Sequence, residues 1–330
     1  MKLVTFRTGD RKMHAGVLRD NNIIELEYPT LLELLHDPDG LQRAQVAVTP
    51  SKQSGFPYIP VSSGLPAALP ELPTTIMQVQ GGPVEDEYTL NEAVLLPPIP
   101  NPSTVRDFYA FEQHVKSARN QRGLDMIPEW YEIPTFYFTN NSEIYGHDNP
   151  IPYPVGSNEL DFELEIACVI GRDGKDIPVE QADSYIAGYT IMNDWSARDF
   201  QRKDMKLNLG PGKGKDFATS IGPVLVTPDE LASRRTGRGA SERYDMPMIA
   251  RINGREVSRG NFNQIYYSFP QMIAYASRNA RIRVGDVIGS GTVGTGCILE
   301  LGTAVHRWLQ RDDEVELEIE GIGVLRNRII

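Results

Sequence analysis

The chain has few cysteines, no apolar run long enough to cross a bilayer and no excess of basic residues. Cys168 and Cys297 are its only cysteines, and neither stands at a spacing typical of metal ligands. Two thiols would be a weak covalent support for 330 residues, so we interpret both as buried apolar residues in a reducing compartment. The first residues lack the apolar stretch of a secretory signal. We therefore expect a cytoplasmic protein that does not enter membranes.

Acidic residues outnumber basic residues, 44 against 33, and give a formal net charge of -11. This balance argues against a nucleic-acid-binding surface, which normally carries clustered basic residues, and it suits a site that collects cations. Hydrophobic residues make up 40% of the chain, which is enough for one large core, with or without a smaller appendage.

Short runs of Val, Ile, Thr and Tyr among 24 prolines and 29 glycines predict an α+β fold that is rich in strands and has few long helices. Helices do not alternate regularly with strands, which argues against a doubly wound parallel sheet. We expect strands at 2–6, 14–18 and 23–26 and a capped helix at 30–36. The proline-rich segment 95–102 is typical of an extended connector, so we place a small N-terminal β domain at 1–100 and a larger domain at 101–330.

The segment 160–166 alternates strictly between acidic and apolar residues. In a strand this pattern places Asp161, Glu163 and Glu165 on one face. Stacked carboxylates repel, and a buried site tolerates them only when a proton or a cation balances them, with oxygen ligands favouring Mg²⁺, Mn²⁺ or Ca²⁺. The segment 314–320 repeats the pattern, and either strand could instead present its carboxylates to water.

The segment 107–114 places an acid and a histidine seven residues apart. If the helical pattern there begins at Asp107, the side chains of Asp107 and His114 lie two turns apart and face one cleft. An isolated histidine is more often a core or surface residue, so this spacing alone does not define a site.

Two further segments are rich in polar residues. In 192–201, Asp194 or Ser196 could equally serve as the cap of a helix that begins there. Around Lys215 a glycine-rich stretch resembles a phosphate-binding loop, but Asp216 follows where a Walker motif requires Ser or Thr. We reject the phosphate loop.

Residues 289–294 satisfy the pattern GxGxxG of a dinucleotide site. We expect a strand at 295–302, whereas a dinucleotide site needs a helix there to hold the pyrophosphate. A tight glycine turn near a ligand fits this segment better.

Taken together, these segments resemble the fumarylacetoacetate hydrolase family over most of 100–330. The residues that carry the resemblance, in the family's order, are DFYAFEQH (107–114), LDFELE (160–165), MNDWSARDFQ (192–201), GKDFATSIGP (214–223), GSGT (289–292), LEL (299–301) and GIGVLRN (321–327). The resemblance implies a mixed β-roll catalytic domain, a divalent metal, a homodimer and chemistry on 1,3-dicarbonyl or enolic acids. The first 95 or so residues are assigned to the family's small N-terminal β domain by position only.

The resemblance also implies a metal site. The family's metal ligands fall on Asp107, Glu163, Glu165 and Asp194. We expect Mg²⁺ there, with Mn²⁺ and Ca²⁺ as alternatives, because all of these ligands are oxygens. The second acidic face, at 314–320, has no such partners and is assigned to solvent.

By the same resemblance, His114 is the general base and Glu300 orients it. Lys215 and Gln201 would lie by the developing oxyanion or the substrate carboxylate, and Tyr137 and Thr292 would contact the substrate. Apart from the resemblance, these four residues could be a solvated lysine and ordinary strand or turn residues.

The chain departs from the family at two positions. Gly123 replaces a substrate-binding arginine, a role that Arg119 or Arg122 could take, and Met205 replaces a tyrosine. The far end of the substrate is therefore expected to bind differently, and an acylpyruvate or a related diketo acid is at least as suitable as fumarylacetoacetate.

The leading hypothesis is a metal-dependent hydrolase that cleaves a C–C bond in a 1,3-diketo acid through water activated by His114, with the metal stabilising the enolate that leaves. A decarboxylase or enol–keto isomerase of a related acid is the alternative among enzymes. A non-catalytic binding protein and a dinucleotide-dependent oxidoreductase are the remaining alternatives.

Overall fold

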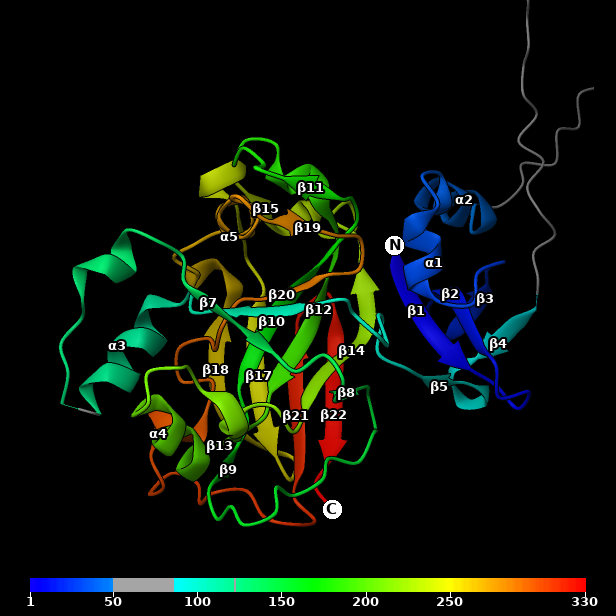
Figure 1. Ribbon diagram of the computed structural model, residues 1–330. Coiled ribbons are helices and arrows are strands. Elements are labelled where there is room, and N and C mark those ends of the chain that lie inside the picture. Colours follow the sequence, from blue (N-terminus) through cyan, green and yellow to red (C-terminus); the bar gives the residue numbers. More distant parts are fainter. Residues whose placement is uncertain (50–85, 122) are drawn as a thin grey trace, which may run out of the picture.

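A mixed sheet of twelve strands runs through the protein, whose computed structural model describes residues 1–49, 86–121 and 123–330 (Figure 1). Its strands are β1 (Lys2–Arg7), β2 (Met13–Arg19), β3 (Asn22–Glu25), β4 (Glu87–Thr89), β5 (Val94–Leu95), β6 (Val105–Phe108), β7 (Phe136–Thr139), β8 (Ile144–Tyr145), β10 (Leu164–Ile170), β12 (Ile186–Asp194), β14 (Thr219–Val226) and β20 (Val287–Gly289). The strand order is β4-β3-β2-β1-β14-β12-β10-β20-β6-β7, with β5 on β1 and β8 on β14.

A second sheet has the order β18-β17-β21-β22. Its strands are β17 (Pro247–Ile252), β18 (Arg255–Asn261), β21 (Glu314–Ile319) and β22 (Gly323–Arg328). Two-stranded pairs join β9 (Leu160–Asp161) to β13 (Ser196–Ala197), β11 (Gly174–Lys175) to β19 (Arg281–Ile282), and β15 (Arg235–Thr236) to β16 (Arg243–Tyr244). This content confirms the strand-rich α+β fold with a β-roll that the sequence predicts.

The helices are short and lie around the sheets. They are α1 (Leu31–His36), α2 (Gly40–Ala47), α3 (Glu112–Asn120), α4 (Arg198–Met205), α5 (Phe269–Ala276) and α6 (Ile298–Leu301). Short 3₁₀ turns occupy Leu90–Glu92, Pro128–Tyr131, Ala182–Tyr185, Gly212–Gly214, Ala232–Arg234, Gly239–Ser241 and Phe262–Gln264. Among the described residues no helix has the length and apolar character needed to cross a membrane.

The core lies where the two sheets face each other. Every residue of β10, β12 and β14 is buried, because β17, β21 and β22 of the second sheet lie against these strands. Cys168 lies in β10 and Cys297 immediately precedes α6, and both are buried free thiols, as the sequence predicts. This rigid core carries the acidic residues described below.

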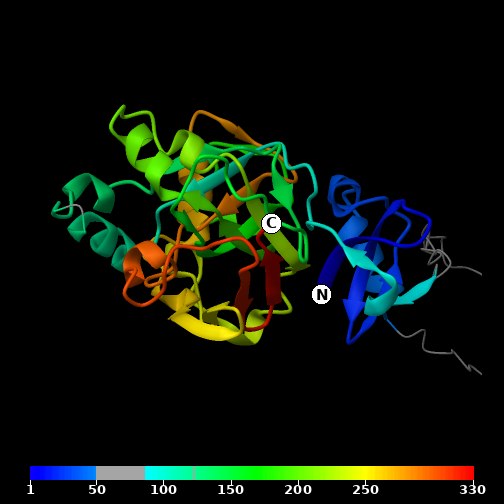
Figure 2. The same ribbon diagram turned by 90° about the horizontal axis from the view of Figure 1, so that it is seen from below.

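The N-terminal strands form as expected and lie to one side of the larger body (Figure 2). Thr30 caps α1 by accepting a hydrogen bond from the backbone N–H of Leu32 at 3.1 Å. Strand β1 pairs with β14, with Lys2 opposite Val226, so the large sheet continues from one part into the other. The division at residue 100 stays a prediction.

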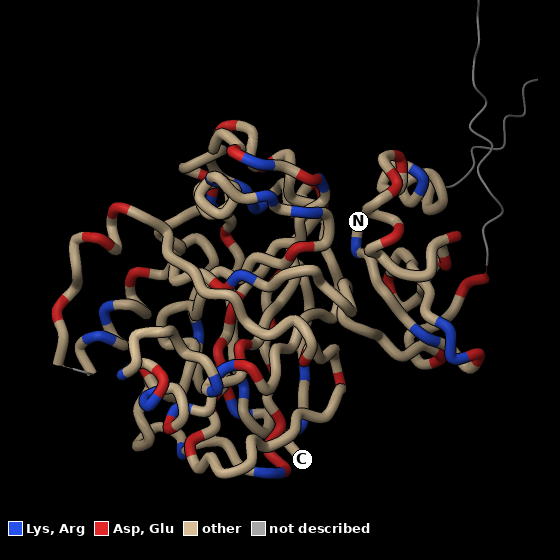
Figure 3. The backbone as a smooth tube through the Cα atoms, in the orientation of Figure 1, with Lys and Arg blue, Asp and Glu red and all other residues tan. Residues whose placement is uncertain are grey.

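Acidic and basic residues are interspersed over both parts (Figure 3).

Local structure differs from the sequence prediction in several places. The helix expected at Asp107 begins only at Glu112, because β6 pairs with β20 on one side and β7 on the other. The segment 160–166 is divided between β9 and β10. The strand expected at 295–302 is wrong, since α6 lies there.

The alternative interpretation of 192–201, in which Asp194 or Ser196 caps a helix, is not what the structure contains. Asp194 ends β12, and α4 begins four residues further on with Ala197 at its N-cap and no side-chain cap. The acidic face of β21 agrees with its assignment to solvent: its glutamates are half-buried, its apolar residues are buried, and Glu318 accepts a hydrogen bond from Arg251 at 2.7 Å.

Candidate active site

Four carboxylates meet at one end of the central strands of the large sheet. Asp107 comes from β6, Glu163 directly precedes β10, Glu165 lies in β10 and Asp194 ends β12. Each residue is at most 4% exposed, and one ligand atom from each lies within 4.8 Å of the others. The structure therefore brings together the four residues named from the sequence, and we call them the acidic cluster.

The glycine turn after β20 lies against this cluster. The N–H of Gly291 donates to Asp107 Oδ1 and to Glu165 Oε2, both at 3.1 Å. A Cβ on Gly289 would lie 2.8 Å from Asp107 Oδ1 and 2.3 Å from Met192 Cε, and a Cβ on Gly291 would lie 2.4 Å from a backbone oxygen. Gly291 also has a φ of 76°. The glycines thus permit close backbone approach to the carboxylates.

Lys215 and Tyr137 supply donors to the cluster. Lys215 Nζ donates to Asp194 Oδ2 at 2.6 Å and to Glu163 Oε2, and Tyr137 Oη donates to Asp194 Oδ2. Lys215 is itself buried. One ammonium therefore serves two of the four carboxylates, while Asp107 and Glu165 rely on the backbone donor of Gly291.

Because the donors are shared unequally, the carboxylates of the cluster differ in pKa. Burial and the neighbouring Asp194 raise the pKa of Asp107 to about 8, and burial with Asp107 raises the pKa of Glu165 well above its ordinary value. Burial acts in the same direction on Glu163, but Lys215 and Arg198 outweigh it and lower its pKa to about 2. The positive charges of Lys215 and Arg198 do not neutralise all four carboxylates of the cluster.

The donor set fits a hard divalent cation. Glu165 Oε1 and Asp194 Oδ1 are buried oxygens with no hydrogen-bond partner in the structure, whereas buried polar atoms are normally paired. Two unpaired oxygens within an all-carboxylate cluster are what a bound cation would satisfy, and oxygen ligation suits Mg²⁺, Mn²⁺ or Ca²⁺. The acidic cluster is therefore able to hold a metal.

A histidine–glutamate pair adjoins the cluster. His114 in α3 donates from Nδ1 to Glu300 Oε1, and Glu300 in α6 accepts the backbone N–H of Thr295 at Oε2, 3.2 Å away. The Tyr109 ring meets the His114 ring edge to face, with centroids 5.4 Å apart. Both side chains are almost fully buried, so the imidazole is held in one orientation.

Arg198, to which sequence analysis assigned no role, links the acidic cluster to the helix that carries Glu300. Arg198 donates to Glu163 Oε1 at 2.7 Å and to Asp161 Oδ2 at 2.8 Å. Asp161 in turn accepts the first N–H groups of α6, at 2.7 Å from Ile298 and 3.0 Å from Leu299. Asp161 therefore faces away from the acidic cluster and fixes the helix that carries Glu300.

Replacing Arg198 by Met should destabilise the fold strongly. Its side chain is 2% exposed and pairs with two buried carboxylates, so its loss is expected to cost about 3–5 kcal/mol of unfolding free energy. Arg202, one turn further along α4, is a matched control: its side chain is 56% exposed, it pairs with Glu159, and its replacement by Met should cost at most about 1 kcal/mol. Urea unfolding of both variants tests this, and equal costs would contradict it.

A cavity of about 880 Å³ is lined by most of the candidate residues. The lining includes Asp107, Glu163, His114, Lys215, Gln201, Tyr137 and Thr292. Gln201 Oε1 accepts a hydrogen bond from Arg198 at 2.9 Å, which fixes the amide at the cavity wall. Arg119 is not among the lining residues, since its Nε donates to the carbonyl of Asp125, and Arg122 lies outside the described residues.

The fold and the site together define an enzyme built on a strand-rich α+β domain, with a buried acidic cluster able to hold a metal. The family model described as fumarylacetoacetate (FAA) hydrolase C-terminal matches residues 103–330. The chain therefore belongs to the fumarylacetoacetate hydrolase family.

Two curated relatives show the range of names within this family. The chain is 33% identical over 201 residues to the human protein named oxaloacetate tautomerase FAHD2A, mitochondrial, covering 60% of this chain and 59% of the relative. It is 31% identical over 275 residues to a fumarylacetoacetase of Oryza sativa subsp. japonica, covering 66% and 64%. The chain thus spans less than two thirds of either relative.

Solved structures share the fold. A fumarylacetoacetate hydrolase from Exiguobacterium antarcticum is 24% identical, with a TM-score of 0.69 over 100% of this chain and 99% of that chain. Fumarylpyruvate hydrolase from Pseudomonas aeruginosa, solved with Mn²⁺ and pyruvate, is 22% identical, with a TM-score of 0.57 over 72% and 91%. At these identities the likeness describes the fold alone.

Proposed function

We propose that this protein is a metal-dependent hydrolase that cleaves the C–C bond of an acylpyruvate or a similar 1,3-diketo acid. The observation that carries the proposal is His114, which pairs with Glu300 and lines the same cavity as Asp107 and Glu163 of the acidic cluster. An enzyme that hydrolyses a diketone needs a base for water beside a site that polarises the substrate. Both requirements have candidates in one cavity.

In this proposal the carboxylate of Glu300 keeps the proton on His114 Nδ1, which leaves Nε2 to take a proton from water. The water oxygen bonds to the acyl carbonyl carbon, and the bond from that carbon to the methylene then breaks. Its electron pair leaves with the pyruvate part as an enolate, which takes a proton at the methylene carbon. The products are a carboxylic acid and pyruvate, so one water is consumed for each bond broken.

Other residues of the cavity have supporting roles in this proposal. Lys215 has three N–H groups, of which two bind Glu163 and Asp194, so the third can donate to the developing oxyanion. Tyr137, Gln201 and Thr292 line the same cavity and would orient the substrate. A divalent cation held by Asp107, Glu163, Glu165 and Asp194 would supply a Lewis acid to the substrate oxygens.

A second candidate is an isomerase, because the human relative named oxaloacetate tautomerase matches this chain about as well as the rice fumarylacetoacetase does. The same imidazole could move a proton between carbon and oxygen of an oxo acid without activating water. Decarboxylation of an oxo acid is a further alternative of the same kind. We also propose that the metal is Mg²⁺, that the protein forms a homodimer and that it is located in the cytoplasm.

Product analysis is expected to separate these reactions. Metal-loaded protein is incubated with acetylpyruvate, fumarylpyruvate, fumarylacetoacetate and oxaloacetate, and the products are identified by NMR. We expect acetate and pyruvate from acetylpyruvate, and we expect EDTA to stop their formation. Faster enol–keto exchange of oxaloacetate with no acid formed from any diketone would instead assign the isomerase. Pyruvate and CO₂ from oxaloacetate alone would assign the decarboxylase.

A further inference from the structure

The cavity is large, and both polar and apolar side chains line it. Its volume of about 880 Å³ lies toward the upper end of the roughly 300–1,000 Å³ that drug-sized ligands occupy. Asp107 and Glu163 of the acidic cluster, His114 and Lys215 contribute polar groups to its wall. Apolar side chains that line the same cavity are Phe108, Ala118, Phe136, Met205, Pro211 and Leu299.

The cations of the cavity offer little to a second carboxylate on the substrate. Arg198 and Lys215 already bind the buried carboxylates described above. Arg202 pairs with Glu159 at 2.6 Å. Among the described lining residues this leaves Lys206, an exposed residue just beyond the end of α4, as the cation with no recorded ion pair. A terminal carboxylate would therefore meet one solvated charge at the rim.

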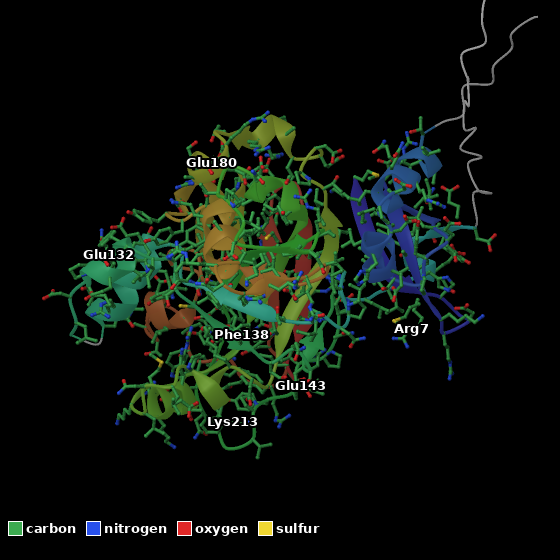
Figure 4. All side chains as sticks on the ribbon, turned by 45° about the horizontal axis from the view of Figure 1, so that its top comes forward. Arg7, Glu132, Phe138, Glu143, Glu180 and Lys213 are labelled. Atoms are coloured by element: carbon green, nitrogen blue, oxygen red, sulfur yellow. The ribbon has the colours of Figure 1, made fainter. Side chains whose placement is uncertain are left out.

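The apolar character continues outward from Met205. Met205, Leu207 and Leu209 are 42%, 73% and 91% exposed, which is uncommon for three large apolar residues in one short segment. Leu207 and Leu209 line a second cavity of about 690 Å³, which shares Tyr137, Gly210, Pro211 and Lys215 with the first. Phe138 and Lys213, which also line the second cavity, lie on the same face of the larger body (Figure 4).

We propose that the acyl group accepted by this site is a long or aromatic apolar group with no terminal carboxylate. The inference rests on the proposed hydrolysis of acylpyruvates and narrows its substrate class. The diketo acid end lies at the acidic cluster and His114, and the tail runs past Phe136 and Leu299 to Met205. Burial of apolar carbon along this path stabilises the complex, whereas a charged tail end loses water there without gaining a buried partner.

Chain length should therefore govern kcat/KM. Each buried methylene is expected to raise kcat/KM about threefold to fourfold, as transfer of a methylene out of water implies. We expect hexanoylpyruvate to exceed acetylpyruvate at least about tenfold and benzoylpyruvate to be a good substrate. Adding a carboxylate to the end of the hexanoyl chain is expected to remove the gain.

Two variants test the path of the tail. Met205→Glu places a charge beside the proposed tail and is expected to lower the ratio of hexanoylpyruvate to acetylpyruvate kcat/KM about tenfold. Val155→Glu is the matched control, since Val155 is 94% exposed and lies outside both cavities, and it should leave that ratio unchanged. Equal rates for all chain lengths would overturn the proposal, as would a preference for the carboxylate-ended chain that is lost in Lys206→Ala.

Binding separates failure of this inference from failure of the proposed reaction. Calorimetric titration of the metal-loaded His114→Ala variant with the same acylpyruvates should show affinity that rises with chain length. Such binding without turnover by the unmodified protein would refute the hydrolase but support the apolar tail site. Turnover of acetylpyruvate, together with affinity that does not depend on chain length, would support the hydrolase and refute the apolar tail site. A third outcome is that Met205→Glu dissociates a dimer and lowers the rates with hexanoylpyruvate and acetylpyruvate equally. In that case the exposed apolar residues Met205, Leu207 and Leu209 would form an interface between copies of the chain, and the inference would be wrong.

Discussion

Replacing Glu165 by Gln is expected to weaken binding of a divalent cation at the acidic cluster about a hundredfold or more. Glu165 is fully buried, one of its oxygens has no partner, and the other accepts the N–H of Gly291. The substitution keeps the size of the side chain and removes a charged ligand. Loss of residues outside the ligand shell already weakens metal binding about 10–100-fold, so loss of a ligand should exceed this. Isothermal titration with Mg²⁺ and Mn²⁺ measures the effect.

The protonation of Glu165 makes this test sharper. Burial and Asp107 raise the pKa of the Glu165 carboxyl well above its ordinary value, which disfavours its charged form in the metal-free protein. Gln at this position should then leave the stability of the metal-free fold nearly unchanged. What should disappear is the rise in Tm on adding metal, because a ligand that binds the native state alone stabilises it by mass action.

The chain supplies a control with the same local pattern. Glu316 in β21 alternates with apolar residues as Glu165 does, but it is half-buried and belongs to a strand whose acidic face meets water. Glu316→Gln should change neither metal affinity nor the metal-dependent Tm. Unchanged affinity in Glu165→Gln, or an equal loss in both variants, would contradict the assignment of the metal site.

The comparison of these two glutamates shows what the sequence can predict. The alternation of acidic and apolar residues predicts strands at both places, and strands are found at both. Pattern alone cannot decide which face meets water, because the partners of Glu165, namely Asp107 and Asp194, come from distant segments. Only the ordered family motifs brought these residues together before the structure did.

The roles of Asp161 and Arg198, which the sequence did not predict, depend on contacts between residues that are far apart in the sequence. Asp161 belongs to the same alternating segment as Glu163, yet the segment breaks between β9 and β10, and Asp161 turns to Arg198 and the start of α6. A four-residue helix has too short a pattern to be recognised. The signal that was present is the arginine itself, which stands between Asp194 and Asp199 in a segment rich in polar residues.

The helix near His114 shows a different limit. Phe108 falls within the helix expected from Asp107 onward, but it ends β6 and packs against Phe136 of the neighbouring strand, with ring centroids 4.9 Å apart. Aromatic residues suit a strand as well as a helix, so tertiary pairing decided the local structure. His114 still reaches the cavity, because α3 begins soon after β6 and carries it back over the acidic cluster.

Replacing His114 by Ala is expected to lower kcat for hydrolysis about a hundredfold or more, the usual scale for loss of a general base. Glu300→Gln keeps an oxygen near Nδ1 but removes the charge that stabilises an imidazolium, so we expect a smaller loss of about tenfold to hundredfold. His306→Ala is the control, because the His306 ring contacts only the neighbouring backbone among its recorded hydrogen bonds and lies outside the cavity. Steady-state kinetics with the best diketo acid measures all three.

The variants of this pair also separate a catalytic role from a structural one. His114 is not in the acidic cluster, so His114→Ala should bind Mg²⁺ as the unmodified protein does, and imidazole added to the open cavity should restore part of the rate. A merely structural histidine would show neither retained metal affinity nor rescue. If hydrolysis were lost while enol–keto exchange of an oxo acid persisted, the proton in that exchange would be moved by another group. Full hydrolytic activity in His114→Ala would instead remove the base from the proposed reaction and with it the hydrolase assignment.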